Sequence, residues 1–160
     1  MKCIKILTSL LILCFATTLS SGQGKANFPV QKGLIADAEN DFDMATVAQL
    51  TKLVNAHKVK TTNQIAVVTV ADYAPYKTLV EYAKDLSANW KLGNNGVAFV
   101  FSEKKNDIKI YVGSGLQPKL NDATTQKIIQ EQILPKFREG NYDQGLINGV
   151  MEVIRLLEVK

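Results

Sequence analysis

The sequence is poor in the side chains that most often carry chemistry. It contains two cysteines, Cys3 and Cys14, and a single histidine, His57. Both cysteines lie in the first 22 residues, so the rest of the chain has no disulfide, no cysteine nucleophile and no cysteine-ligated metal. It also lacks the His-Glu-x-x-His metalloprotease motif, the phosphate-binding Walker loop and the Gly-x-Ser-x-Gly nucleophile elbow. The enzyme classes that depend on these motifs are excluded.

Long hydrophobic runs are also missing, apart from one at the N-terminus. Residues 6–16 are apolar and follow a short basic start, and small residues at 20–22 offer a cleavage point. This pattern predicts a secretory signal peptide over residues 1–22, and its apolar run is too short to span a membrane. Lipid attachment at Cys14 is the alternative, but the bulky Leu13 before it does not fit such a signal. We expect an exported protein, periplasmic or secreted, with no membrane span in the mature chain.

Strong charge is absent as well. Removal of Lys2 and Lys5 with the signal lowers the formal net charge from +4 to +2. No basic patch with interleaved aromatic residues occurs, so nucleic acid is not expected as a partner.

The clearest secondary-structure pattern in the sequence lies between residues 94 and 116. Residues 96–102 are almost wholly apolar, which is typical of a strand covered on both faces. Residues 107–112 alternate between apolar and polar side chains, which predicts a strand nearer an edge. Polar residues 104–107 form the turn of this hairpin. Its two open ends, 94–96 and 113–115, contain glycine and should meet at one edge of the sheet.

Helical and strand patterns fill the rest of the chain. Apolar periodicity predicts helices over 44–58, 78–91, 122–134 and 142–157, with Pro135 interrupting the third and Gly140 in the break before the last. Residues 63–71 predict a buried strand, and the connection onward implies a right-handed parallel pair. The expected fold is therefore α/β: a three-layer α/β/α sandwich around a small mixed β-sheet. It would occupy residues 33–158 after a flexible leader over 23–32.

Carboxylates gather in two places. Acids occupy every second position from Asp37 to Asp43, so an extended backbone would point all of them to one side. A site for a hard divalent cation and a solvated loop that caps the next helix are both consistent with this pattern. Asp72 follows the buried strand 63–71 directly, and either a ligand site or a turn cap before Pro75 explains it.

Two other features have a structural and a chemical interpretation. His57 lies near the end of a predicted helix, where a histidine interacts favourably with the helix dipole, and no motif ties it to catalysis. The lone Gly113-Ser114-Gly115 could present amides to a phosphate, although such a pair of glycines after a strand is more often a tight corner.

Five motifs occur in one order along the chain. They are Ile35-Ala36-Asp37-Ala38, the strand 62–70, Trp90-Lys91-Leu92-Gly93-Asn94-Asn95-Gly96-Val97, the segment 110–116 and the segment 133–142. Together they resemble the TPM domain family over roughly residues 33–155. The resemblance implies an α/β/α sandwich that binds a divalent cation, calcium in particular. It also implies an accessory role beside membrane complexes, or the acid phosphatase activity attributed to a plant member.

The family's aspartate falls on Asp37 and its Asn-Gly loop on Asn95-Gly96, with Asn94 where other members often carry Asp. Oxygen ligands favour calcium or magnesium over zinc. We therefore expect a metal site of Asp37, Asp72, Asn94 and Asn95 in a non-catalytic, monomeric accessory domain of the cell envelope.

Two alternatives stay open. The first is a metal-assisted acid phosphatase that holds its phosphate on the amides of Gly113, Ser114 and Gly115. The second is a ligand-free structural domain that binds another envelope protein.

Overall fold

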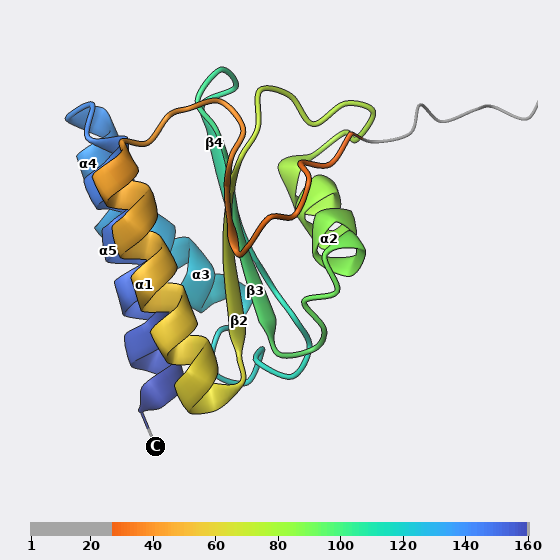
Figure 1. Ribbon diagram of the computed structural model, residues 1–160, viewed down its shortest axis with the longest axis vertical. Helices are drawn as coiled ribbons and strands as arrows, with labels where there is room; N and C mark the ends of the chain where they lie inside the picture. The colour runs from red at the N-terminus through yellow and green to blue at the C-terminus, as the bar shows by residue number, and fades with distance from the viewer. Residues whose placement is uncertain (1–26, 160) are drawn as a thin grey trace, which may run out of the picture.

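A four-stranded mixed sheet lies between two layers of helices (Figure 1). The structure, a computed structural model, describes residues 27–159. The strands are β1 (Ile35–Asp37), β2 (Gln64–Thr69), β3 (Gly96–Ser102) and β4 (Asp107–Val112), in that spatial order. β1, β2 and β3 run parallel, and β4 is antiparallel to β3. The predicted three-layer α/β/α sandwich around a small mixed sheet is confirmed.

The helices divide unequally between the two faces of the sheet. α2 (Leu79–Asn89) covers one face alone. The other face is covered by α1 (Met44–Thr61), α3 (Asp122–Ile128), η1 (Ile129–Ile133), α4 (Leu134–Arg138) and α5 (Tyr142–Glu158). Four N-caps, at Asp43, Thr78, Asn121 and Asn141, accept a hydrogen bond from the amide three residues later. These caps satisfy helix amides that have no partner inside the helix.

Strand β1 was not predicted. Its three residues lie at the head of the alternating acids, a pattern that also fits a solvated loop. In the structure, Ile35 pairs with Val67 and Asp37 with Thr69 in parallel register. The missing element matters for function because it brings Asp37 to the carboxyl end of a parallel strand.

Pro135 does not end its helix, contrary to prediction. The five-residue π-helical turn η1 precedes α4, and the amide of Leu134 bonds to the carbonyl of Ile129. Proline lacks an amide and crowds the carbonyl four residues back, and a widened turn accommodates both effects. The helical path therefore continues to Arg138. It ends before Gly140, which has a φ of 75° and lies in the predicted break.

The core lies on both faces of β2 and β3. Every residue of β3 is buried, as are five of the six residues of β2. Tyr82 and Leu86 cover the sheet from α2, and Leu146 and Val150 cover it from α5. Burial of this apolar surface is the main favourable term for folding, and residues 27–159 contain no cysteine that could add a disulfide.

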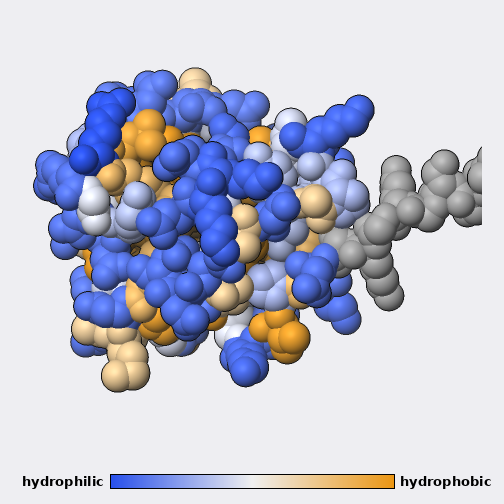
Figure 2. Space-filling view, turned by 90° about the horizontal axis from the view of Figure 1, so that it is seen from above, coloured by the Kyte–Doolittle hydropathy of each residue, from blue (hydrophilic) through white to orange (hydrophobic). Residues whose placement is uncertain are grey.

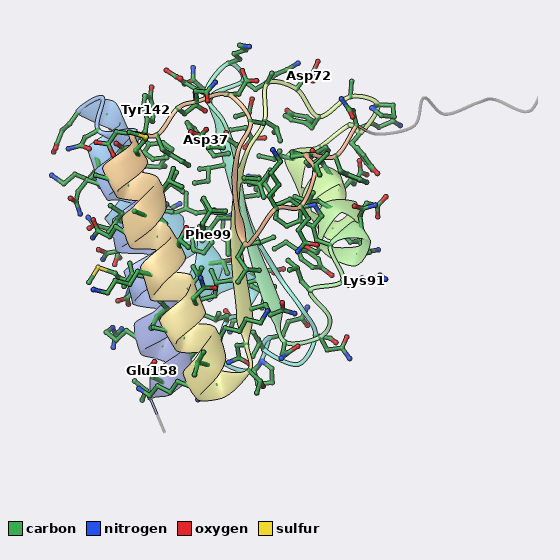
Figure 3. All side chains as sticks on the ribbon, in the orientation of Figure 1. Asp37, Asp72, Lys91, Phe99, Tyr142 and Glu158 are labelled. Atoms are coloured by element: carbon green, nitrogen blue, oxygen red, sulfur yellow. The ribbon has the colours of Figure 1, made fainter. Side chains whose placement is uncertain are left out.

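His57 is a structural residue at the contact between α1 and α5. Its side chain is fully buried, and Nδ1 lies 3.3 Å from Oε1 of Glu158. Hydrogen bonds from Lys60 and then from His57 lower the pKa of Glu158. Figure 3 shows Glu158 at the opposite end of the molecule from Asp37. His57 therefore joins two helices at a distance from the carboxylates described below.

Part of the predicted flexible leader is packed on α2. The ring of Phe28 lies edge-on to Tyr82 with centroids 5.2 Å apart, and 6.3 Å from Tyr76. Nε1 of Trp90 donates a 3.2 Å hydrogen bond to the carbonyl of Pro29. Residues 1–26, with the predicted signal peptide, lie outside the described residues. Within the described part of the chain, no helix is long and apolar enough to cross a membrane.

Replacing Phe28 by alanine should lower the free energy of unfolding by about 1–2 kcal/mol, less than a fully buried phenylalanine because the ring is only half-buried. Urea denaturation of the mature protein measures the change. Val30→Ala is the matched control, since Val30 is 77% exposed and should change stability little. Equal effects of the two variants would mean that the segment does not pack on α2.

Candidate functional site

The carboxyl ends of three parallel strands meet at one edge of the sheet. Asp37 closes β1, Thr69 closes β2 and Ser102 closes β3. The loops 38–43 and 70–78 and the β3–β4 turn 103–106 cover this edge. Figure 2 views it from above: hydrophilic side chains form most of the surface, with hydrophobic atoms visible between them. Open α/β sheets bind ligands at this edge because the loops of neighbouring strands converge there.

Asp37 organises the loop that follows it. Its Oδ1 accepts hydrogen bonds from Thr69 Oγ1 at 2.7 Å and from the amide of Asp41 at 3.0 Å. Its Oδ2 accepts the amide of Phe42 at 3.0 Å. Thr69 Oγ1 in turn accepts the amide of Glu39 at 3.2 Å. The carboxylate of Asp37 thereby fixes the first loop against the end of β2.

The alternating acids do not form one row. The backbone turns after β1, and Asn40 adopts a left-handed conformation with a φ of 57°. The carboxylate of Asp43 is not part of this group of acids. It caps α1 instead, because its Oδ1 accepts a 2.6 Å hydrogen bond from the amide of Thr46. The extended backbone assumed from the sequence is therefore limited to β1.

Asp41 carries the most perturbed carboxyl of this edge. Burial, and then the neighbouring charges of Glu103, Asp37 and Glu39, raise the pKa of Asp41 to about 6. Its Oδ2 is buried and accepts no hydrogen bond within the described part of the chain. An acid that is partly desolvated beside like charges holds its proton more tightly, or attracts a cation.

Two lysines of the β3–β4 turn pair with the two loops. Lys104 Nζ lies 2.6 Å from Glu39 Oε2, and Lys105 Nζ lies 3.4 Å from Asp72 Oδ1. The hydrogen bond and the charge of Glu39 raise the pKa of Lys104. The closed end of the hairpin is thus the end that faces the two acidic loops.

Asp72 acts as a turn cap. Its Oδ1 accepts the amides of Tyr73 at 2.7 Å and Ala74 at 3.1 Å. The bonds from Ala74 and then Tyr73 lower the pKa of its carboxyl. Of the two interpretations left open by the sequence, the turn cap is the one that the structure supports, although Asp72 lies at the edge expected for a ligand site.

Asn94 and Asn95 lie at the opposite edge of the sheet from Asp37 and Asp72. β3 is parallel to β2, so its amino end, where Gly96 pairs with Gln64, lies where β2 begins. A strand of seven residues spans about 20 Å. The Nδ2 of Asn95 donates instead to the carbonyl of Thr62 at 2.8 Å. The four residues predicted to hold one metal ion therefore cannot do so together.

The open ends of the hairpin do meet, but at that far edge. The amide of Gly113 donates to the carbonyl of Gly96 at 2.8 Å, and that of Gly115 donates to Asn94 at 2.9 Å. A Cβ on Gly113 would lie 2.6 Å from the carbonyl oxygen of Asn94. The segment from Gly113 through Ser114 to Gly115 is thus a tight corner, with two of its amides already occupied.

Sequence reasoning missed Glu103, which contributes the largest charge effect on Asp41. It directly follows β3, and a parallel β2–β3 pair places such a residue at the same edge as Asp37. The parallel pairing of the two strands was the sequence signal that could have identified Glu103. Across residues 27–159, no three acidic, histidine or cysteine side chains converge closely enough to ligate one metal ion.

Comparison with known proteins agrees with this architecture. The sequence profile of the TPM domain matches residues 35–156. The chain belongs to the TPM domain family. No curated protein matches it.

Three solved structures are similar to this TPM domain. The N-terminal domain of a protein from P. gingivalis is 27% identical, with a TM-score of 0.73 over 78% of this chain and 82% of that one. The N-terminal domain of cg2496 from Corynebacterium glutamicum is 10% identical, with a TM-score of 0.63 over 79% and 80% of the two chains. BA42 from Bizionia argentinensis is 19% identical, with a TM-score of 0.63 over 75% and 83%. The last two show the shared fold alone.

Asp41→Asn should stabilise the TPM domain near neutral pH. In the folded protein the pKa of Asp41 is about 6, whereas in the unfolded chain the pKa of an aspartate is about 3.9. The folded state binds more protons in this window, so the free energy of unfolding falls as pH rises through it. Because the carboxyl is partly exposed, we expect a gain of only ~1 kcal/mol at about pH 7.5 and none at about pH 4.

Urea denaturation at the two pH values measures this gain. Asp72→Asn is the control, because the pKa of Asp72 is lowered and its removal should not stabilise the protein. Loss of stability in Asp41→Asn at about pH 7.5 would contradict the repulsion between the acids.

Gly113→Ala should destabilise the TPM domain by about 2 kcal/mol, because the added methyl group meets the backbone of residues 93 and 94. Thermal and urea denaturation measure the change. Gly33→Ala is the matched control, since no atom lies within 4 Å of a Cβ built there. If Gly113→Ala left the free energy of unfolding unchanged, the corner would have room for the added methyl group.

Proposed function

We propose that this TPM domain binds a divalent cation, calcium before magnesium, at the carboxyl edge of its sheet and serves as an accessory module for another protein of the cell envelope. The observation that carries the cation site is the carboxyl of Asp41, whose buried oxygen has no hydrogen-bond partner in the described part of the chain. Export rests on the predicted signal peptide, and the partner is inferred from the family.

Electrostatics supports a cation at this position. Glu103, Asp37 and Glu39 all raise the pKa of Asp41, so their combined negative potential also favours a bound cation. Carboxylate oxygens are the ligands that calcium prefers. Asp41 and Glu103 are the proposed ligands, and Glu39, which is paired with Lys104, adds negative charge beside them.

Two of the residues first expected to ligate have positioning roles in this proposal. Asp37 holds the loop through three hydrogen bonds, and Asp72 caps its own turn. Few side-chain ligands remain, so backbone carbonyls and water would complete the shell of the ion. Sites of this kind bind calcium weakly, with a Kd of roughly 10⁻⁴–10⁻³ M.

The phosphatase alternative loses its supporting geometry. Its phosphate was expected on the amides of Gly113 to Gly115, beside the cation. These glycines lie at the amino end of β3, the edge opposite Asp37. A cation at the carboxyl edge therefore cannot polarise a phosphate held there, and the accessory role remains as the proposal.

Titration of calcium into ¹⁵N-labelled mature protein tests the site. At about pH 7.5 we expect amide shifts confined to residues 39–42 and 103–105, saturating near millimolar calcium. At about pH 5 the affinity should fall about tenfold, because the Asp41 proton competes with the ion. Asp41→Asn and Glu103→Gln should each abolish saturation, whereas Asp72→Asn should bind as the wild type does.

Shifts centred on residues 94–96, or none up to about 10 mM calcium, would refute the proposal. A weaker effect of Asp41→Asn than of Asp72→Asn would also refute it. Magnesium titrated under the same conditions distinguishes the two ions, and we expect weaker binding because magnesium demands a stricter octahedral shell.

A further inference from the structure

A cavity of about 260 Å³ opens beside the start of β4, where α4 and α5 pack against the sheet. We call it the Phe101 pocket, after the buried aromatic residue in its lining. Phe101, Phe137 and Tyr142 provide its aromatic lining, and Asn106, Asp107 and Arg138 provide its polar lining. Figure 3 shows Tyr142 at the same end of the molecule as Asp37. None of these lining residues belongs to the proposed cation site.

The aromatic side of the pocket is a packed cluster of three rings. The centroids of Phe101 and Phe137 are 4.8 Å apart, those of Phe101 and Tyr142 5.4 Å, and those of Phe137 and Tyr142 4.9 Å. Phe101 is buried, whereas Phe137 and Tyr142 are half-buried and leave surface exposed to the cavity. A cavity of about 150 Å³ already holds benzene, so this one has room for a single ring and a short polar chain.

The polar side of the pocket carries one cation and one carboxylate that do not pair with each other. Arg138 is exposed and makes no ion pair or side-chain hydrogen bond with any residue between 27 and 159, whereas its neighbour Lys136 binds Glu139 at 2.8 Å. Asp107 has a distant partner in Lys109, whose Nζ lies 3.7 Å from Oδ1. A guanidinium and a carboxylate thus line one apolar cavity, each with unused hydrogen-bonding capacity.

We propose that the Phe101 pocket binds a free aromatic amino acid. The ligand ring would pack on Phe137 and Tyr142, where aromatic pairs gain stabilisation beyond burial of area. Its carboxylate would bind Arg138, whose planar guanidinium suits a bidentate contact. Its ammonium would bind Asp107. One small molecule of this kind would contact the apolar wall and pair with both charges. A purely anionic ligand would not pair with Asp107, and a purely apolar ligand would pair with neither charge.

Isothermal titration of the mature protein with L-phenylalanine tests the proposal. Phenethylamine lacks the carboxylate of phenylalanine, and 3-phenylpropanoate lacks its ammonium. Each analogue should bind the wild type roughly tenfold more weakly than phenylalanine does, since each loses one charge-assisted hydrogen-bonding group. The titration is performed in EDTA and again with calcium, so that failure of the cation site leaves this result unaffected.

Two variants test which charged side chain of the pocket binds which charged group of the ligand. Arg138→Gln should bind phenylalanine and phenethylamine equally, and Asp107→Asn should bind phenylalanine and 3-phenylpropanoate equally. Lys136→Gln, the matched control, changes a neighbouring cation that does not line the pocket and should retain full affinity. Arg138 has no partner in the described part of the chain, so its replacement should leave the melting temperature unchanged, which circular dichroism verifies.

Amide shifts at residues 106–108 and 137–142 in a titration with phenylalanine would locate the ligand. Absence of heat and shifts at about 10 mM ligand would overturn the proposal. Equal binding of all three compounds to the wild type would overturn it too, as would a loss of affinity in Lys136→Gln equal to that in Arg138→Gln. Binding that requires calcium would assign the carboxylate to the cation rather than to Arg138, which also overturns it.

Discussion

The parallel pairing of β1, β2 and β3 is the constraint on which the rest of this structure depends. Backbone hydrogen bonds in the registers Ile35–Val67 and Val67–Phe99 align three carboxyl ends at one edge. The loops that follow these strands have to converge there, whatever their sequences. β4 returns antiparallel, so the closed turn of the hairpin joins the same edge and its open ends are carried away from it. The location of every candidate residue follows from these pairings.

The acidic side chains at this edge are of two kinds: most have hydrogen-bond or ion-pair partners, and one is destabilised by its neighbours. Both carboxylate oxygens of Asp37 and Oδ1 of Asp72 accept hydrogen bonds, and Glu39 is held by Lys104. Asp41 differs, because burial and neighbouring acids raise its pKa to about 6. The fold tolerates such repulsion at a small cost in stability. The same local destabilisation is the reason that the proposed cation site centres on Asp41, since an ion would relieve it.

Most of the fold could be predicted from the sequence, because periodicity and local turn chemistry act over a few residues. The apolar run of β3, the alternation of β4 and the starts of the helices at residues 44 and 122 all lie where the patterns indicate. Two departures share a physical cause. β1 is a strand of three residues that exists only because β2 offers it backbone partners. The π-helical turn before Pro135 forms because packing on α5 holds the helix together on both sides of the proline.

The candidate site was predicted less well. The sequence by itself determined which residues carry charge, where glycine allows a close corner, and that Asp72 follows a buried strand. Only the tertiary structure decided which of them meet, because strand direction is a long-range property that local patterns do not encode. Parallel pairing separates Asn94 and Asn95 from Asp37 and brings Glu103 towards Asp41 instead. It was likewise tertiary packing that gathered Phe101, Phe137 and Tyr142 beside Arg138, since segments about 40 residues apart form one cavity only after the helices dock on the sheet.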